Sequence, residues 1–226
     1  MIDPRDVDLR HACTRMDSSV QVALEEFWIY SFLVAGKTSS TIAPRLDGML
    51  EDLRRRRSHS NPGVFEAIEE FLQSNIDHTQ YIKEWGFGQQ KRTLKFLQQT
   101  IDMTRSKMDS GIRKYPIQYW SLNEISSIYG VGLKTSRFFL MNTRYNVRVA
   151  AIDTHIIKYM KAKGILPEET PSATPTNKKV YQEYEAKFLE VADRYKKDPR
   201  DFDQEIWNHY SKNKSEGIAC RESIAA

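Results

Sequence analysis

The chain has 226 residues, of which 40% are hydrophobic and 28% are charged, a composition typical of a soluble globular protein with one large or two small domains. The formal net charge of +4 fits a polyanionic partner, and the two cysteines, Cys13 and Cys220, exclude a disulfide framework and a cysteine-rich metal site. The sequence shows neither a signal peptide nor an apolar run of membrane-spanning length, so we expect an intracellular protein.

Helical spacing of apolar residues recurs along the chain without convincing strand-like alternation, which predicts an all-α protein. The segment that starts at Val20 is apolar nearly all round, which indicates a buried central helix. Thr38 and the two serines after it offer N-caps for a helix that continues to Leu53. Further helices are predicted over residues 65–72, 76–84 and 90–108.

Four consecutive arginines, Arg54 to Arg57, stand at the end of the second predicted helix and are followed by turn residues. Arg54 and Arg55 are candidate contacts to DNA phosphates, each of which would add to the salt dependence of binding. The run is equally compatible with a solvated helix end, where cations complement the helix dipole. Both interpretations stay open.

Two helices joined by a tight hairpin are predicted from Leu122 onward. The hairpin turn is Tyr129-Gly130-Val131-Gly132. Its two glycines let the backbone take positive φ and leave no Cβ in the way of a close approach. A second helix that begins near Leu133 would direct its first unpaired N–H groups and the positive end of its dipole outward, which suits a phosphate. We therefore expect Gly130, Val131 and Gly132 to contact a DNA backbone.

The C-terminal third continues the helical pattern. Asp153 is suited to cap a helix over residues 154–161. Residues 167–177 contain three prolines and form a linker or loop. Two more helices are predicted over residues 179–195 and 202–210, separated by a break at Asp198-Pro199.

The hairpin, the lysine behind it and Asp153 together resemble the helix-hairpin-helix DNA glycosylases, the superfamily of endonuclease III and 8-oxoguanine DNA glycosylase. The family hairpin Leu-Pro-Gly-Val-Gly-x-Lys-x-Ala stands here as residues 128–136, with Tyr129 in place of the proline and Ser136 in place of the alanine. The family motif Val-Asp-Thr-His stands as Ile-Asp-Thr-His, residues 152–155. The four-cysteine iron–sulfur loop of endonuclease III is missing.

The resemblance covers roughly residues 22–210 and implies two helical lobes with the active site in the cleft between them. We expect an inner bundle over residues 22–145, and a second lobe made of residues 1–21 plus 146–226. More faintly, residues 33–40 resemble the family segment that wedges into the duplex, which places Lys37 at the wedge. Residues 85–91 resemble a glycine turn that precedes another family helix.

The resemblance assigns the chemistry to Lys134 and Asp153. Lys134 would attack C1′ of the damaged nucleotide, and Asp153 would be essential for base loss. Independently of the family, breaking an N-glycosidic bond develops positive charge on the sugar, which a nearby carboxylate stabilises. A neutral lysine amine can form a Schiff base at C1′, from which the 3′ phosphate leaves by β-elimination. The nucleotide must first be flipped out of the duplex.

The resemblance also implies a K+ or Na+ ion held by the backbone carbonyls of Ser126, Ile128 and Val131, and no other cofactor. His155 is a further candidate phosphate contact, although a lone histidine on a helix is more often structural.

The sequence therefore predicts a monomeric base-excision repair enzyme that acts on double-stranded DNA with a damaged base or an abasic site. It would be a DNA glycosylase with AP-lyase activity on an oxidised base, 8-oxoguanine being the first candidate. Two alternatives keep the fold: an enzyme acting on modified DNA bases in another pathway, and a non-enzymatic DNA-binding module. Each motif alone also has a plain interpretation, since Lys134 could be a solvated lysine after a capping turn and Asp153 a simple N-cap.

Overall fold

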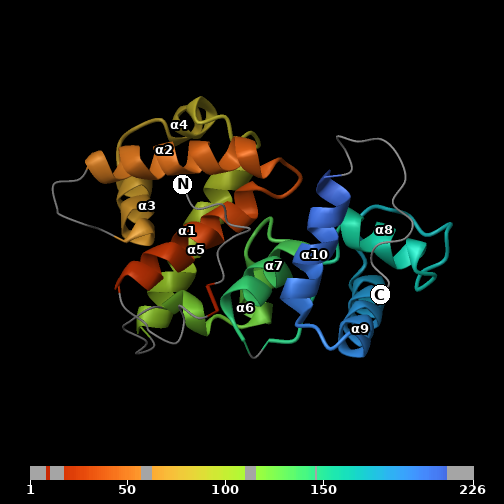
Figure 1. Ribbon diagram of the computed structural model, residues 1–226. Helices are drawn as coiled ribbons and strands as arrows, with labels where there is room; N and C mark the ends of the chain where they lie inside the picture. Colours follow the sequence, from red (N-terminus) through yellow and green to blue (C-terminus); the bar gives the residue numbers. More distant parts are fainter. Residues whose placement is uncertain (1–8, 11–17, 57–62, 110–115, 146, 213–226) are drawn as a thin grey trace. The chain divides into compact units, whose positions relative to one another are not determined.

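The computed structural model describes residues 9–10, 18–56, 63–109, 116–145 and 147–212 (Figure 1). Within these ranges every regular element is helical, which confirms the predicted all-α class. The chain forms two compact units, Met1–Val147 (unit 1) and Arg148–Ala226 (unit 2), and each is described by itself. Most of residues 1–21 lie outside the described ranges, so their assignment to the second lobe stays a prediction, as does the cleft. None of the described helices is long and apolar enough to cross a membrane.

Unit 1 is built from helices that begin and end close to the predicted positions. Its described helices are α1 (Ser18–Leu33), α2 (Ser39–Arg55), α3 (Val64–Gln73), α4 (His78–Glu84), α5 (Gln90–Asp109), the 3-10 helix η2 (Pro116–Tyr119), α6 (Leu122–Ser127) and α7 (Leu133–Thr143). The two helices predicted to begin at Leu122 and near Leu133, joined by a tight turn, are therefore confirmed as α6 and α7.

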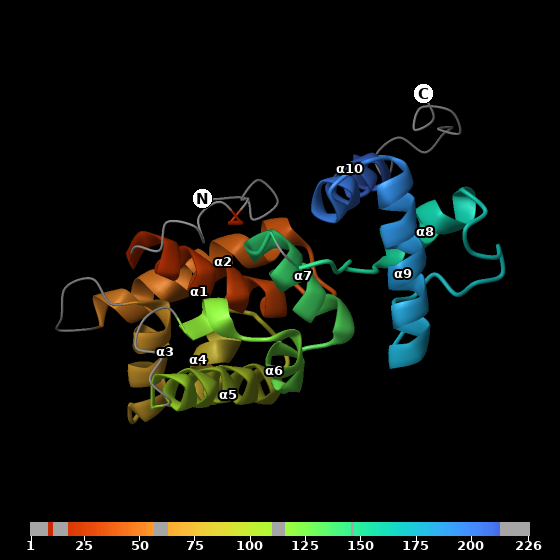
Figure 2. The same cartoon turned by 90° about the horizontal axis from the view of Figure 1, so that it is seen from below.

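Helix α1 is the centre of the core of unit 1, as its all-round apolar sequence predicts, and packs against α2, α3, α7 and η2 (Figure 2). Trp28 of α1 is fully buried, with its ring centroid 5.1 Å from that of Phe139 in α7 and 5.4 Å from that of Phe96 in α5. Its indole N–H donates to Thr100 Oγ1 at 3.0 Å, so the polar end of the ring is satisfied. Helix α5 and helix α7, the second helix of the hairpin, are thus both anchored on one tryptophan.

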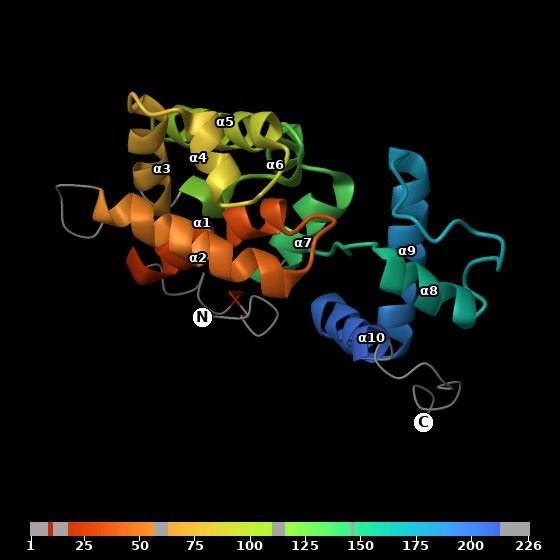
Figure 3. The ribbon, with the colours of Figure 1, turned by 90° about the horizontal axis from the view of Figure 1, so that it is seen from above.

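Unit 2 contains α8 (Thr154–Ala162), α9 (Lys178–Arg194) and α10 (Pro199–Lys212), with α10 packed against both α8 and α9 (Figure 3). Phe202 of α10 fills its core, stacked on Phe188 at 5.4 Å and edge-on to Tyr159 at 5.5 Å. Helix α10 begins at Pro199, three residues earlier than the predicted range. The break at Asp198-Pro199 is also the start of this helix, because proline suits its first position and Asp198 Oδ1 accepts the N–H of Arg200 at 2.9 Å.

Candidate active site

The turn between α6 and α7 is tight and well anchored. Helix α6 starts at a capping box, in which the Ser121 hydroxyl accepts the N–H of Glu124 and the Glu124 carboxylate accepts the N–H of Ser121. The turn is closed by the N–H of Val131, which donates to the carbonyl of Ile128 at 3.0 Å. Helix α7 then begins after its N-cap, Gly132, as the sequence predicts.

Only one of the two glycines of the turn uses positive φ. Gly130 has φ of +80°, and its carbonyl accepts a hydrogen bond from Arg92 Nη2 of α5 at 2.7 Å. Gly132 has φ of −85° and ψ of 175°, which any residue adopts, so the expectation of positive φ is wrong for Gly132. A Cβ on Gly132 would meet no atom within 4 Å. The turn therefore presents an open backbone surface at Gly132, at the N-terminus of α7.

Lys134 is the second residue of α7 and is partly exposed. It stands one residue beyond Leu133, whose carbonyl accepts hydrogen bonds from Ser136 Oγ at 3.0 Å and from Arg137 Nη1 at 3.3 Å. Ser136 and Arg137 are both buried, so the first turn of α7 is fixed on its inner side while Lys134 keeps access to solvent. A lysine that forms a covalent bond to a ligand needs a fixed backbone of this kind and a side chain that is not buried.

Asp153 is the N-cap of α8 in unit 2, which confirms the structural interpretation of this residue. Its Oδ1 accepts the N–H of His155 at 2.8 Å and that of Ile156 at 3.0 Å, and the residue is only 9% exposed. Capping does not compete with a role in catalysis, because two backbone N–H donors hold the carboxylate in one orientation.

Two buried side chains of α9 fix the segment that leads to Asp153, and sequence reasoning assigned a role to neither. The Tyr181 hydroxyl donates to the carbonyl of Ala150 at 2.9 Å and accepts the N–H of Ile152 at 2.8 Å. The Glu185 carboxylate accepts the N–H of Ala150 at 2.9 Å. Spacing alone marks Tyr181 as a core residue of an amphipathic helix, and its bonds to residues some thirty positions away leave no signal in the sequence.

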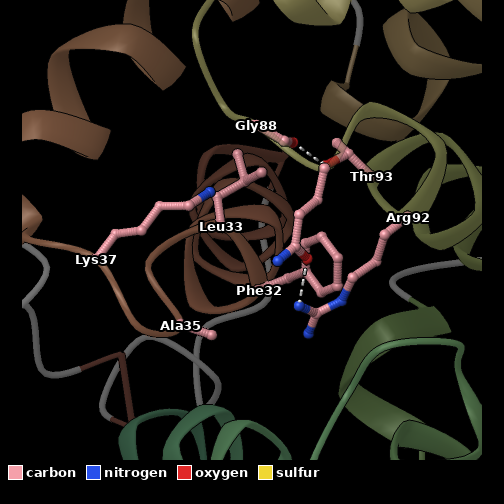
Figure 4. Close-up of a pocket in the computed structure, with 8 residues that line it drawn as sticks. Phe32, Leu33, Ala35, Lys37, Gly88, Arg92 and Thr93 are labelled. Atoms are coloured by element: carbon pink, nitrogen blue, oxygen red, sulfur yellow. Dashed lines mark hydrogen bonds between the residues drawn. The ribbon is translucent and has the colours of Figure 1, made fainter.

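Lys37 lies in the loop between α1 and α2 and contributes to a small pocket of about 30 Å³ (Figure 4). The residues that line the pocket are Phe32, Leu33, Ala35, Lys37, Gly88, Gln89, Arg92 and Thr93. This volume has room for one or two water molecules and not for a nucleobase, so the pocket does not hold a flipped base. Lys37 Nζ donates to the carbonyl of Phe87. Burial lowers the pKa of Lys37, and the charges of Arg92 and Arg45 lower it further.

The loop on the other side of this pocket has an unusual backbone. Gly86, Gly88 and Gln89 have φ of +67°, +68° and +43°, and Gln89 is one of two non-glycine residues with positive φ among those described. Its side chain accepts a hydrogen bond from Arg92 Nη1 at 2.7 Å. The glycine turn that the sequence indicates over residues 85–91 is therefore present, and Arg92 links it to the carbonyl of Gly130 in the hairpin.

Three cations in or near the pocket donate to neutral acceptors among the described residues. Lys37 and Arg45 donate to the carbonyls of Phe87 and Gly86, and Arg92 donates to the carbonyl of Gly130 and the amide of Gln89. Within the described ranges none of the three forms an ion pair with a carboxylate. Lys37, Arg45 and Arg92 thus form a cluster of uncompensated positive charge beside the hairpin, the basic cluster.

The described part of the arginine run has a different environment. Arg54 pairs with Glu26 at 2.5 Å, Arg55 pairs with Glu51, and Arg56 pairs with Asp52 at 2.7 Å. Arg55 also ends α2, about 24 Å along the helix axis from its start beside Lys37, at 1.5 Å per residue. These pairs favour the solvated helix end over a contact to DNA phosphates.

His155, the remaining histidine candidate, packs within unit 2. Its ring lies edge-on to Trp207 of α10 with 5.9 Å between centroids, and 6.5 Å from the ring of Tyr210. These contacts give His155 a role in joining α8 to α10, as expected for a structural histidine.

The candidate carbonyls for a monovalent cation all belong to the hairpin. Ser126 lies in the last turn of α6, where carbonyls no longer have the N–H of a residue four positions ahead in the helix. The Ile128 oxygen accepts one N–H, from Val131, and a carbonyl has two lone pairs. Neutral oxygen donors of this kind suit K+ or Na+. Among the described residues no group of three or more His, Cys, Asp or Glu side chains could hold a metal ion.

Two comparisons with known proteins bear on this arrangement. The family model Ogg-HhH, 8-oxoguanine DNA glycosylase, matches residues 65–197, which include the hairpin, Lys134, Asp153 and Arg92. The crystal structure of the 8-oxoguanine DNA glycosylase of Thermotoga maritima is similar in fold, with a TM-score of 0.57 and 20% sequence identity, and the match covers 88% of this chain and 82% of that chain. No curated protein matches the chain significantly.

Proposed function

Because the chain belongs to the Ogg-HhH family of 8-oxoguanine DNA glycosylases, we propose that it excises 8-oxoguanine from double-stranded DNA and then cleaves the strand as an AP lyase. The observation that carries this proposal is the placement of Lys134. A partly exposed lysine stands in the first turn of α7, directly behind the open backbone of Gly132. A DNA backbone seated on the hairpin would bring a sugar within reach of this amine.

Lys134 and Asp153 divide the chemistry between them. As the C1′–N bond of the lesion breaks, positive charge develops on the sugar, and the carboxylate of Asp153 opposes it. The departing base keeps the electron pair of the broken bond and takes up a proton. Nζ of Lys134 bonds to C1′ and loses a proton. The C1′–O4′ bond of the sugar ring then breaks, O4′ keeps the electron pair and takes up a proton, and the ring-opened sugar is left as an imine on Lys134. Loss of a proton from C2′ then breaks the C3′–O bond, and the 3′ phosphate leaves with its electron pair. Water hydrolyses the imine and restores the lysine.

The hairpin and the basic cluster supply the contacts to DNA in this proposal. The backbone at Gly130, Val131 and Gly132 binds one phosphate together with the first N–H groups of α7, since the first amides of a helix have no partner within that helix and suit an anion. Lys37, Arg45 and Arg92 add positive charge, and in the described part of the chain no carboxylate pairs with any of them. Binding of undamaged duplex should therefore weaken steeply between low and physiological salt. Arg54 and Arg55 contribute little to binding, because each already has an acidic partner.

A bound K+ or Na+ at the carbonyls of Ser126, Ile128 and Val131 would add a positive charge beside the phosphate that the hairpin binds. The affinity for undamaged duplex would then be higher in KCl or NaCl than in tetramethylammonium chloride at equal ionic strength. Equal affinities in all three salts would count against this ion.

The proposal is tested with a panel of duplexes that each contain one lesion, with 8-oxoguanine, an abasic site and undamaged DNA among them. Products are separated on a denaturing gel before and after alkali. We expect the strand with 8-oxoguanine to be cut without alkali. Cleavage only after alkali would contradict the lyase step and leave a monofunctional glycosylase. Binding without cleavage of any lesion would contradict the enzyme and support a DNA-binding module.

A further inference from the structure

One stripe of α5 holds the turn of the hairpin by three contacts. Arg92, Lys95 and Gln99 are spaced three and four residues apart and so lie on one face of the helix. Arg92 donates to the Gly130 carbonyl at 2.7 Å, and Lys95 Nζ lies 4.1 Å from the centroid of the Tyr129 ring. Gln99 Oε1 accepts the main-chain N–H of Tyr129 at 2.6 Å. The first two residues of the turn are therefore both fixed from outside the hairpin.

The contact from Gln99 depends on the type of residue at position 129. Tyr129 stands where the resembling hairpins have proline, which has no N–H and holds its own φ near −65°. A tyrosine has a freer backbone, and Tyr129 is 45% exposed, so packing does little to fix it. The hydrogen bond to Gln99 and the ring contact with Lys95 restrain this residue in place of a proline ring.

We propose that Gln99 is a positioning residue for DNA binding, which holds the Tyr129 N–H so that the backbone of Gly130 to Gly132 keeps the orientation that receives a phosphate. The inference rests on the proposed function only in that the hairpin binds DNA; it does not require base excision. Without Gln99 the turn spends part of its time in other conformations. The affinity for DNA then falls in proportion to the fraction of molecules that still have the binding conformation.

The test is a double-mutant cycle between Gln99 and residue 129, measured as affinity for an undamaged duplex by fluorescence anisotropy. Gln99→Ala should weaken binding about three- to tenfold, the range that corresponds to one lost hydrogen bond. In a Tyr129→Pro background the same substitution should change nothing, because proline offers no N–H. Ile128 has φ of −70° and ψ of 132°, which a following proline allows. An equal loss in both backgrounds, or no loss in either, would overturn the role.

Two further measurements separate positioning from general stability. Gln98→Ala is the matched control, since Gln98 lies beside Gln99 on α5, is exposed and bonds to Asp102 at 2.9 Å, away from the hairpin. It should leave affinity unchanged in both backgrounds. Hydrogen–deuterium exchange of the Tyr129 amide should rise in Gln99→Ala and stay low in Gln99→Glu, which keeps the acceptor. This readout decides the matter even if Tyr129→Pro does not fold, and unchanged exchange in Gln99→Ala would contradict the proposal.

The cycle also keeps this inference distinct from the proposed function. If the duplex with 8-oxoguanine is not cut but Gln99 and Tyr129 are coupled in binding, the enzyme assignment fails and the positioning role stands. If the lesion is cut and the two residues are not coupled, the positioning role alone fails.

Discussion

Gly130 and Gly132 have opposite backbone requirements, although one residue separates them in the hairpin turn. Gly130 has φ of +80°, and a Cβ there would lie 2.7 Å from Arg92 Nε and 3.0 Å from Phe32 Cε2. Gly132 has an ordinary extended conformation, and a Cβ there would meet nothing within 4 Å. The fold requires glycine at position 130. At position 132 the fold accepts a side chain, and glycine is needed only if a ligand approaches the backbone there.

Gly132→Thr should therefore weaken DNA binding and spare stability. Threonine is about as good an N-cap as glycine, so the free energy of unfolding should change by less than about 0.5 kcal/mol. Its branched side chain would block the approach of a phosphate to the backbone, and affinity for duplex should fall at least about tenfold. Anisotropy titration and urea unfolding measure the two effects.

Gly130→Ala provides the reverse case. The left-handed backbone and the close contact with Phe32 should lower the free energy of unfolding by about 1–3 kcal/mol. If Gly132→Thr destabilises the protein as much as Gly130→Ala does, or binds DNA as well as the wild type, the hairpin surface is not a phosphate site.

Glu124 makes the stability of the hairpin dependent on pH. Its hydrogen bond with Lys107, followed by that with the Ser121 N–H, lowers the pKa of Glu124 from 4.5 to about 2. A carboxyl whose pKa is lower in the folded state adds stability above its unfolded pKa, and this is lost as pH falls from about 4.5 towards 2. Glu124→Gln should cost about 1 kcal/mol at pH 7 and reduce the loss in that window.

Glu51→Gln is the matched control for this prediction, because Glu51 pairs with Arg55 on an exposed face with 64% of its side chain accessible. Its effect on unfolding by urea should stay below about 0.5 kcal/mol at any pH. A Glu124→Gln variant with the same pH profile as the wild type would show that the capping box is not coupled to the ion pair.

The helices were predictable because each depends on local pattern. The all-round apolar sequence of α1, the cap of α8 and the glycine turn before α7 are all visible in consecutive residues. Thr38 stands at the N-cap position of α2 as predicted, but its hydroxyl bonds to Thr41 Oγ1 and not to a main-chain N–H. The predicted start of α10 is three residues too late, because the sequence marks Asp198-Pro199 only as a break. Helix α9 has already ended at Arg194, and Pro199 is the first residue of α10.

The two catalytic candidates are predictable from the sequence for the same reason. The side chains that hold the backbone near them are not. Lys134 and Asp153 each belong to a short motif of consecutive residues. Arg92 and Gly130 are far apart in sequence, as are Tyr181 and Ala150, and each pair is joined only by folding. The four-arginine run has the densest positive charge in the sequence, but its described members pair with carboxylates. The three cations of the basic cluster are far apart in the sequence, so charge density along the chain does not indicate them.

Lys37→Ala should slow excision of a damaged base in duplex DNA much more than cleavage of a ready-made abasic site. We propose that Lys37 fills the gap left by the flipped nucleotide, as its place in the resembling segment implies, and an abasic site needs less unstacking before it can be flipped out. Arg55→Ala is the control and should leave both rates unchanged, since Arg55 already pairs with Glu51. Single-turnover rates on the two substrates measure the difference, and equal slowing by Lys37→Ala would make this residue a phosphate contact only.

Asp153→Asn and Asp153→Ala should separate capping from chemistry. Asparagine caps a helix as well as aspartate does, so Asp153→Asn should unfold within about 0.5 kcal/mol of the wild type, whereas alanine should cost about 1 kcal/mol. Both should lose most base excision, because no full negative charge opposes the charge on the sugar. An Asp153→Asn variant that excises at the wild-type rate would limit Asp153 to its role as a cap.

Trapping of the imine at Lys134 tests the account most directly. Sodium borohydride added during reaction with a duplex that carries 8-oxoguanine or an abasic site should reduce the Schiff base and leave a covalent protein–DNA adduct on a denaturing gel. Lys134→Gln should abolish this adduct and keep affinity for duplex nearly unchanged, because one charge among many contacts matters little. A wild-type protein that forms no adduct, or a Lys134→Gln variant that still forms one, would contradict the assignment of Lys134 as the nucleophile.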